Sequence, residues 1–338
     1  MAARSSSAFT LIELLVVIAV IALLVGILLP SLAGARKAAR AVQCAANARS
    51  VATGVHIYSG DNKTLIPPSY VYAADAIGTR WTWADQQNTI GTAYGYIHWS
   101  YSLFDTNGIT PEAFTCPEMA KGGAPAANPG PDALDREPGQ TPENTAVTDR
   151  QSRRMAYTGN AALFCRNKFN GSEQRKNKLT TTSGVDGSAR GASKTILVTE
   201  FFNSPNYLGL RDGSGIIKSH RPITPFIGVT SGQDVYAEGD GGNAPRFAYA
   251  NINSILTNNE LFNQEFAIDS GSETPLNAVG RHHPGKEEGQ YGGSASFAFV
   301  DGHVDQMHVR ETIRKYLWGD NFWSLTGTNN RVGIPAGN

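Results

Sequence analysis

The chain has 338 residues, of which 41% are hydrophobic and 17% are charged, so it is long enough to bury a substantial core. Its 29 basic and 29 acidic residues cancel, which argues against nucleic-acid binding because no long-range positive field attracts phosphates. The 36 glycines and 17 prolines favour a body of short strands and turns over a helical bundle.

The N-terminus consists of a short leader, Met1 to Ala8, followed by an apolar run from Phe9 to Leu29. This run has 21 residues, and a helix of that length spans about 30 Å, the hydrocarbon thickness of a bilayer. Glu13 is its single charged residue, and a carboxylate in hydrocarbon costs on the order of a few kcal/mol unless it is protonated or paired. We therefore expect a transmembrane segment over 9–30 in which Glu13 has a partner.

This segment strongly resembles the processing site of type IV prepilins and type II secretion pseudopilins. In that family a prepilin peptidase cuts before the phenylalanine and methylates the new N-terminus. The resemblance implies that residues 1–8 are the leader, that the cut falls between Ala8 and Phe9, and that Glu13 is the assembly carboxylate. Glu13 would then pair with the terminal amine of a neighbouring subunit, which offsets two groups that are costly in lipid. Ala8 stands where the family usually has glycine, and we expect its small side chain to be tolerated.

Pro30 matches a proline that the family carries near the end of the span. We interpret it as a kink between lipid-embedded and soluble halves, although a proline that ends the hydrophobic helix explains it equally well. Arg4 precedes the span, whereas Arg36, Lys37 and Arg40 follow it, a distribution that by itself favours the opposite orientation. The motif outweighs this charge pattern, so we expect a single-pass protein of the bacterial inner membrane with an extracytoplasmic body.

A secretory signal peptide is the alternative interpretation of the N-terminus. Ala33-Gly34-Ala35 has the small-x-small form of a signal-peptidase site, and cleavage there would release a soluble protein. The charged Glu13 inside the apolar run, the weakly basic start and a helical pattern that continues through this site all argue against it.

Residues 31–60 predict the amphipathic half of the same helix. Apolar side chains recur there at spacings of four, three, four and three and share one helix face: Cys44, Ala48, Val51, Val55 and Tyr58. Gly60-Asp61-Asn62 is the expected stop. This face should pack against a globular body.

Residues 61–338 predict that body, and the whole chain predicts an α+β, pilin-like fold with a long N-terminal helix on antiparallel sheet. Short aromatic and β-branched runs indicate strands within Tyr94–Phe104, Thr195–Phe202 and Ser294–Val304. Gly, Pro and polar residues dominate 121–145, which we interpret as a loop insertion, and 231–245 is a second loose stretch.

Four body segments resemble a large pilin-like family with a C-terminal His-x-Asp-Gly signature. They are Phe114–Glu118, Ser193–Glu200, Arg281–Gly285 and Phe297–Val304. The signature would be His283, Asp301 and Gly302, within a region spanning 281–304. Its histidine and its Asp-Gly lie further apart than in the family, so Lys286–Gly293 looks like an insertion.

Three cysteines, Cys44, Cys116 and Cys165, lack any C-x-x-C spacing and allow one disulfide with one thiol left over. Outside the cytoplasm such a bridge is favoured. We expect Cys44 to pair with Cys116, the alternative for Cys44 being a small apolar side chain on the buried helix face.

Asp301-Gly302 is the dipeptide expected at a two-residue hairpin turn, where glycine supplies a positive φ. The alternative groups His283, Asp301, His303 and Glu200 as ligands of a divalent metal, because imidazole and carboxylate suit such ions. We favour the turn and expect neither a metal nor a cofactor.

Nothing in the sequence indicates catalysis: it contains no nucleophile elbow, no H-E-x-x-H helix and no phosphate loop. Asp234, Glu238 and Asp240 lie in a glycine-rich loop that lacks EF-hand spacing. An aromatic cluster could be a binding surface but is more typical of core: Trp81, Trp83, Tyr94, Tyr96, Trp99 and Tyr101.

The resemblance therefore implies a non-enzymatic subunit of a type IV pilus-like or type II secretion filament. Its expected partners are prepilin peptidase, other pilin-like subunits and the membrane. The alternative is a membrane-tethered binding module that does not polymerise.

Overall fold

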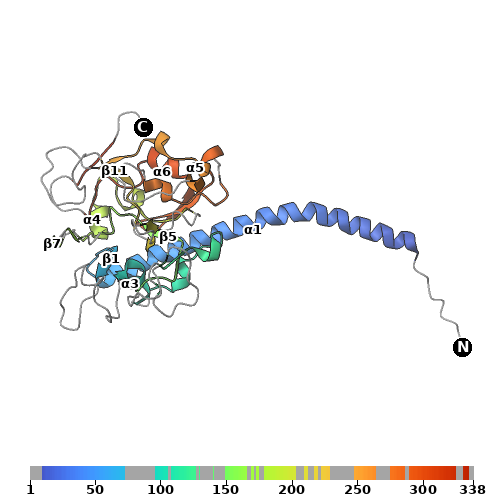
Figure 1. Cartoon of the computed structure of the whole chain (residues 1–338), viewed down its shortest axis with the longest axis horizontal. Coiled ribbons are helices and arrows are strands. Elements are labelled where there is room, and N and C mark those ends of the chain that lie inside the picture. Colours follow the sequence, from blue (N-terminus) through green and yellow to red (C-terminus); the bar gives the residue numbers. More distant parts are fainter. Residues whose placement is uncertain are drawn as a thin grey trace.

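The computed structural model consists of one long helix and a globular body (Figure 1). It describes residues 10–72, 96–105, 108–126, 129, 140, 149–165, 169–170, 173–174, 179–202, 209–211, 217–219, 222–228, 247–263, 275–285, 289–324 and 330–334. Ala8, Phe9, most of the 121–145 insertion and all of 231–245 lie outside these residues. The helix and the mainly antiparallel sheets of the body form the expected α+β, pilin-like fold.

Helix α1 runs from Leu11 to Asp61, and its 51 residues give it a length of about 77 Å. Asn62 caps its C-terminus and donates its side-chain amide to the carbonyl of Tyr58 at 2.8 Å. Pro30 lies inside the helix, which therefore does not end there. Ser31 Oγ donates to the Leu28 carbonyl at 2.8 Å beside it, and Figure 1 shows a continuous, gently curved rod.

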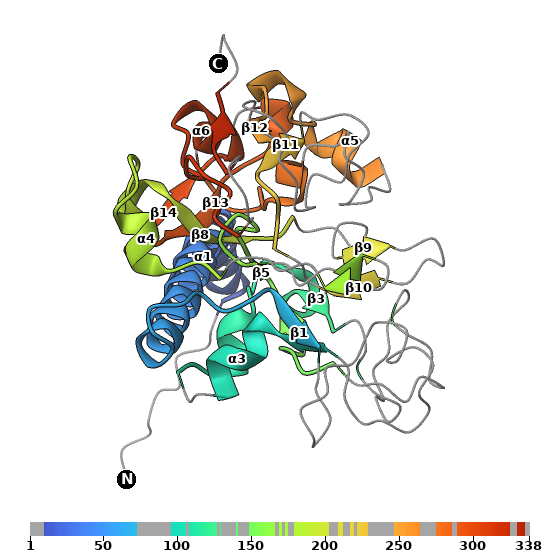
Figure 2. The ribbon, with the colours of Figure 1, turned by 90° about the vertical axis from the view of Figure 1, so that its left-hand side faces the viewer.

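The second part of α1 packs on a four-stranded antiparallel sheet of order β14-β13-β8-β5. The strands are β5 (Tyr157–Gly159), β8 (Ile196–Glu200), β13 (Ala295–Phe299) and β14 (Val304–Met307). Phe297 pairs with Thr199 and Asp305, and Tyr157 pairs with Glu200. Every residue of β8 and β13 is buried, because elements cover these central strands on both faces (Figure 2).

The expected buried face of α1 matches the structure. Cys44, Ala48, Val51 and Val55 are fully buried, and Tyr58 packs against the same core while partly exposed. Burial of α1 against the body begins at Ala41, because residues 31–40 are all exposed. The free rod is therefore about ten residues longer than the apolar run alone.

Smaller sheets surround this layer. β11 (Phe226–Gly228) pairs antiparallel with β12 (Phe247–Tyr249), which pairs parallel with β15 (Val332–Gly333). Four two-stranded ribbons pair β1 (Tyr70–Tyr72) with β2 (Tyr96–His98), β3 (Ala124–Pro125) with β4 (Arg154–Met155), β6 (Phe169–Asn170) with β7 (Glu173–Gln174), and β9 (Gly209–Arg211) with β10 (Ile217–Ser219). β3 lies within the predicted loop insertion, so the start of that segment is not a loop.

Short helices complete the body. The α-helices are α3 (Trp99–Asp105), α4 (Thr182–Asp186), α5 (Asn258–Asn263) and α6 (Val309–Arg314). The 3₁₀ turns are η1 (Pro111–Phe114), η2 (Ala120–Gly122), η3 (Ala192–Lys194), η5 (Ile252–Ser254), η6 (Pro275–Ala278) and η7 (Gly289–Tyr291). Buried apolar side chains from Cys44 to Phe322 form one contiguous core.

The strand prediction for Tyr94–Phe104 is wrong in its second half. Among the residues of this stretch that the structure describes, Tyr96–His98 is a strand and Trp99–Asp105 forms α3. Trp99 and Leu103 lie one helical turn apart and are both fully buried against the core beside α1. A short apolar run fits a helix as well as a strand, and here the packing decided.

The turn between β13 and β14 also differs from the expected two-residue form. Phe299 N donates to the His303 carbonyl at 2.9 Å, so three residues, Val300 to Gly302, form the loop. Gly302 N donates to the Phe299 carbonyl at 3.0 Å, and Gly302 has a φ of +90°. This is the three-residue hairpin in which glycine takes the left-handed position after a tight turn.

Candidate functional site

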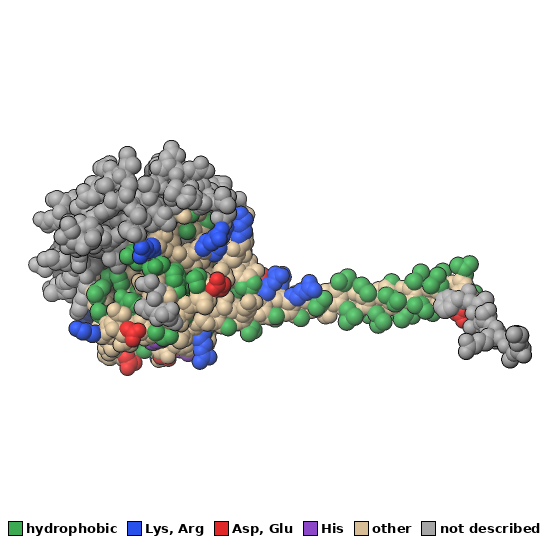
Figure 3. Space-filling model, turned by 90° about the horizontal axis from the view of Figure 1, so that it is seen from below, with side chains coloured by type: hydrophobic (Ala, Val, Ile, Leu, Met, Phe, Trp, Pro, Cys, Tyr) green, Lys and Arg blue, Asp and Glu red, His purple; other side chains and the backbone are tan. Residues whose placement is uncertain are grey.

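The exposed half of α1 is the largest apolar surface of the part of the chain that the structure describes. Sixteen large aliphatic side chains between Leu11 and Leu32 are 45–86% exposed. Figure 3 shows them covering the rod on the visible face as far as the body. Soluble monomers rarely expose contiguous apolar surface of this extent, which marks a membrane or partner interface.

A membrane accounts for this surface energetically. The helix is long and apolar enough to cross one, judged by length and composition. Each aliphatic residue at the centre of a span favours insertion by about 0.3–0.6 kcal/mol, so the sixteen together contribute on the order of 5–10 kcal/mol. That exceeds the cost, about 2.5–3.5 kcal/mol, of placing one acidic residue at the centre.

Glu13 takes part in the N-terminal cap of α1. Thr10 is the N-cap residue, and its backbone N and its Oγ1 donate to Glu13 Oε2 at 2.8 and 2.9 Å. Glu13 N donates back to Thr10 Oγ1 at 3.3 Å. This capping box satisfies two of the free backbone N–H groups at the helix start, and it explains locally why the helix begins at Leu11.

Basic side chains follow the apolar surface where the rod meets the body (Figure 3). Arg36, Lys37 and Arg40 are exposed. Arg40 lies 3.6 Å from Glu118 of the body, with 53% of the Arg40 side chain and 15% of the Glu118 side chain exposed. One of the three cations therefore has an acidic partner in the body.

In the body, Glu200 and His283 form a buried polar pair. Glu200 Oε1 lies 2.9 Å from His283 Nε2, and both side chains are fully buried. The second carboxylate oxygen, Oε2, accepts from Ser296 N at 2.8 Å. His283 is held in place because its backbone N and O bridge to Ser294 at 3.0 Å each. Within the predicted insertion, the described residues Gly289–Tyr291 form η7.

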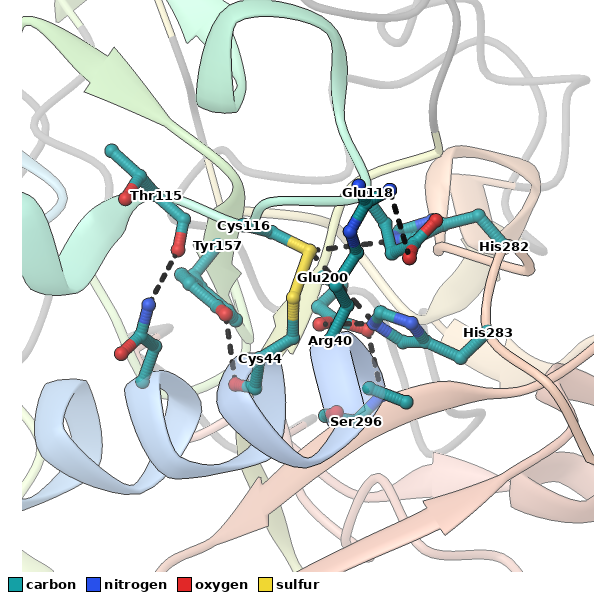
Figure 4. Close-up of a disulfide and its surroundings, with 12 residues drawn as sticks. Arg40, Cys44, Thr115, Cys116, Glu118, Tyr157, Glu200, His282, His283 and Ser296 are labelled. Atoms are coloured by element: carbon teal, nitrogen blue, oxygen red, sulfur yellow. Dashed lines mark hydrogen bonds and ion pairs between the residues drawn. A yellow bond between two sulfur atoms is a disulfide. The ribbon is translucent and has the colours of Figure 1, made fainter. Parts of the chain in front are cut away.

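A disulfide lies directly against this pair (Figure 4). It joins Cys44 on α1 to Cys116, with 5.2 Å between their Cα atoms, and closes a separation of 72 residues. Cys116 Sγ lies 3.9 Å from His283 Nε2 and 3.7 Å from His282 Nε2. Tyr157 OH donates to the Cys44 carbonyl at 2.8 Å. Burial lowers the pKa of His282 to about 4, so its ring is neutral at pH 7.

The structure places the four residues considered as metal ligands in two separate pairs. Glu200 and His283 lie together, as described, whereas Asp301 and His303 lie in the exposed β13–β14 turn. There His303 Nδ1 is 2.5 Å from Asp301 Oδ1. Asp301 is five residues beyond Ser296 along the hairpin, a distance of about 15 Å at strand rise. The structure therefore does not bring these four residues together.

The aromatic cluster is only partly described. Trp99 is fully buried and packs against Phe114 and Phe164, so it belongs to the core. Tyr101 is partly buried, and Trp81, Trp83 and Tyr94 lie outside the described residues, as do Asp234, Glu238 and Asp240.

Sequence reasoning missed the proximity of His282, Cys116 and Cys44 to the Glu200–His283 pair. A signal was present, because Cys116, Glu200 and His283 each fall in one of the four body segments that resemble the pilin-like family. These three segments lie more than eighty residues apart, and no sequence spacing predicts that they pack side by side.

Comparison with protein families finds one match: residues 3–29 fit the prokaryotic N-terminal methylation motif. Searches of curated proteins and of solved structures gave no match. The motif and the long apolar helix together support a type IV pilin-like protein that is processed by prepilin peptidase and associates with the membrane. Proteins of this kind are structural pilins rather than enzymes.

Proposed function

We propose that the chain is a non-enzymatic subunit of a type IV pilus-like or type II secretion filament. Prepilin peptidase cuts between Ala8 and Phe9 and methylates the new terminus. Before assembly the subunit resides in the bacterial inner membrane through its apolar helix, with the body on the extracytoplasmic side. Within this proposal, the body is of the pilin-like type that carries a C-terminal His-x-Asp-Gly signature, here His283, Asp301 and Gly302.

The exposed rod of α1 is the observation that carries the proposal. Its apolar surface extends past Pro30 to Leu32, and the same helix continues without interruption into the part that anchors the body. In lipid this surface faces acyl chains, and in a filament the same surface packs against neighbouring rods. One helix therefore serves both states, and the body does not need to refold when the subunit leaves the membrane.

Glu13 supplies the specificity of assembly in this proposal. Its carboxylate bonds to Thr10 of the same chain, which caps the helix but supplies no positive charge. The terminal amine of an axially displaced neighbour would provide the opposite charge. Breaking a buried ion pair costs about 3–5 kcal/mol, so its loss should weaken subunit addition by more than about 100-fold.

Glu13→Gln tests this role. A glutamine at this position keeps the capping box because its amide oxygen accepts the same bonds, but it removes the charge. We expect the variant to be inserted in the membrane and processed normally, and to give no filaments by electron microscopy and by crosslinking between helices.

Thr10→Ala is the matched control, because it removes the cap hydroxyl and keeps the carboxylate. It should assemble. Loss of filaments in Thr10→Ala but not in Glu13→Gln would mean that assembly needs the helix cap and not the charge of Glu13, and normal assembly of Glu13→Gln would refute the intersubunit pair.

The intact mass of the protein from its own membranes tests the processing step. A chain that begins at N-methylated Phe9 supports the proposal, whereas one that begins at Arg36 would show cleavage by signal peptidase after Ala35. A processed chain that forms no filaments under any condition would instead favour the membrane-tethered binding module.

A further inference from the structure

Four groups that commonly bind metals converge where α1 meets the sheet. They are Cys44 and Cys116, which form the disulfide, and the adjoining Glu200 and His283 (Figure 4). One ligand atom from each lies within 4.8 Å of all the others, and all four residues are buried. They come from α1, from the segment after η1, from β8 and from the segment bridged to β13.

The disulfide does not explain why the two polar residues of this cluster, Glu200 and His283, are buried beside it. A disulfide is apolar and needs no charged neighbour, whereas burying a carboxylate and an imidazole costs several kcal/mol unless strong interactions compensate. The Glu200–His283 contact and the Ser296 N–H provide part of that compensation. A cation held by the same groups together with two thiolates would provide more.

We propose that, when the Cys44–Cys116 bond is open, these four residues bind one Zn²⁺ ion in tetrahedral geometry. The ligands would be Cys44 Sγ, Cys116 Sγ, His283 Nε2 and Glu200 Oε1. Zinc is the fitting ion because two thiolates, one imidazole and one carboxylate are ligands that it accepts in four-coordinate sites.

The distances support this geometry. Zn–S bonds of about 2.3 Å and Zn–N bonds of about 2.0–2.1 Å place sulfur and nitrogen about 3.6 Å apart around a tetrahedral ion. Cys116 Sγ lies 3.9 Å from His283 Nε2. Glu200 Oε1 and His283 Nε2, now 2.9 Å apart, would separate by about 0.4 Å. The Ser296 N–H holds Glu200 Oε2 and leaves Oε1 for the metal.

The disulfide and the zinc site exclude each other. Reduction by a phosphine breaks the S–S bond: the phosphine donates two electrons and gains an oxygen from water, and the two sulfurs take up the two protons of that water. Zinc then displaces these two thiol protons, so both sulfurs become thiolate ligands. Either state links α1 to the body, because Cys44 belongs to the helix and the other three residues to the body. All four residues are buried, so zinc would enter as the body folds around α1.

Cobalt(II) is the probe that tests the site. The full chain in detergent is unfolded in the presence of a phosphine, freed of metal by a chelator and refolded with increasing Co²⁺. We expect one ion per chain, with a thiolate-to-cobalt charge-transfer band and the intense visible bands of tetrahedral cobalt, and displacement by one equivalent of Zn²⁺. The disulfide-bonded chain should bind none.

Variants show whether these residues are the ligands. Cys116→Ser, which leaves Cys44 as the single thiolate, should lower the charge-transfer band by about half or more, and Glu200→Gln, which keeps the Ser296 bond, should weaken zinc binding by at least about tenfold. His303→Asn, in the exposed turn, is the matched control and should bind as the natural chain does. Emission of the buried Trp99 and Trp318 reports whether each variant is folded.

The proposal fails if the reduced, folded chain binds no cobalt, or if the same bands persist in folded Cys116→Ser. If Cys116→Ser does not fold, Glu200→Gln is the deciding variant. Unchanged zinc affinity in Glu200→Gln would refute the proposed zinc site. None of these outcomes depends on whether the chain assembles into filaments.

Discussion

Removing the Cys44–Cys116 crosslink should destabilise the body strongly. The bridge closes a separation of 72 residues, and the chain-entropy model gives about 4 kcal/mol for a loop of that length. Both sulfurs are fully buried and belong to the core, so water does not replace the lost contacts. The double variant Cys44→Ala/Cys116→Ala, which can form neither the bridge nor the zinc site, is the cleanest perturbation.

The assay is thermal unfolding of the full chain in detergent with a metal chelator present, followed by emission of Trp99 and Trp318, which are both fully buried. For a body of this size, the Tm falls by about 2–4 °C for each kcal/mol lost from the free energy of unfolding. We therefore expect the Tm of the double variant to be lower by roughly 8–16 °C. Cleavage of α1 beyond Ala41 by a protease should also become faster, because the bridge fixes this part of the helix to the sheet.

Cys165→Ala is the matched control, because Cys165 is buried but not bridged. It should lower the free energy of unfolding by about 1 kcal/mol, the usual effect of a single substitution. If the double variant is no less stable than this control, the bridge does not constrain the unfolded chain, and the reasoning from loop length is refuted.

Three further predictions concern single residues. Gly302→Val should cost about 1–2 kcal/mol in chemical denaturation, because φ is +90° there, and Gly302→Asn, which tolerates that region, should cost less. Tyr157→Phe should cost about 0.5–1.5 kcal/mol, because the buried hydrogen bond from its hydroxyl to the Cys44 carbonyl is lost; an unchanged midpoint would show that the bond contributes nothing. Burial raises the pKa of Cys165 to about 12, so the folded chain at pH 8 should react with iodoacetamide at least about 10³-fold more slowly than the unfolded chain by mass spectrometry. The folded state then binds the extra proton, so the stability contributed by this thiol is complete below pH 9 and falls as the pH rises toward 12.

The N-terminal part of the site was accessible from the sequence because its signals are local. An apolar run of membrane length and a single carboxylate near its start need no knowledge of the fold. The Thr10–Glu13 capping box is also local, because its two residues lie three positions apart, and a threonine followed three residues later by glutamate before an apolar run is the sequence signal for it.

The body was harder to predict because its order depends on contacts between distant segments. A helical spacing of three and four identified the buried face of α1, and the β8 and β13–β14 strands followed from their β-branched and aromatic residues. The same kind of run at Trp99 became a helix, because local propensity is weak and burial against α1 favoured that form.

The sequence by itself determined the anchor of this protein: where the apolar helix lies, where its carboxylate sits, and which helix face turns toward the body. These properties depend on residue type and helical period alone. Only the tertiary structure decided which polar groups meet. It brought Glu200 and His283 to the Cys44–Cys116 bridge and left Asp301 and His303 in an exposed turn, because strand pairing and helix packing join residues that no sequence spacing connects.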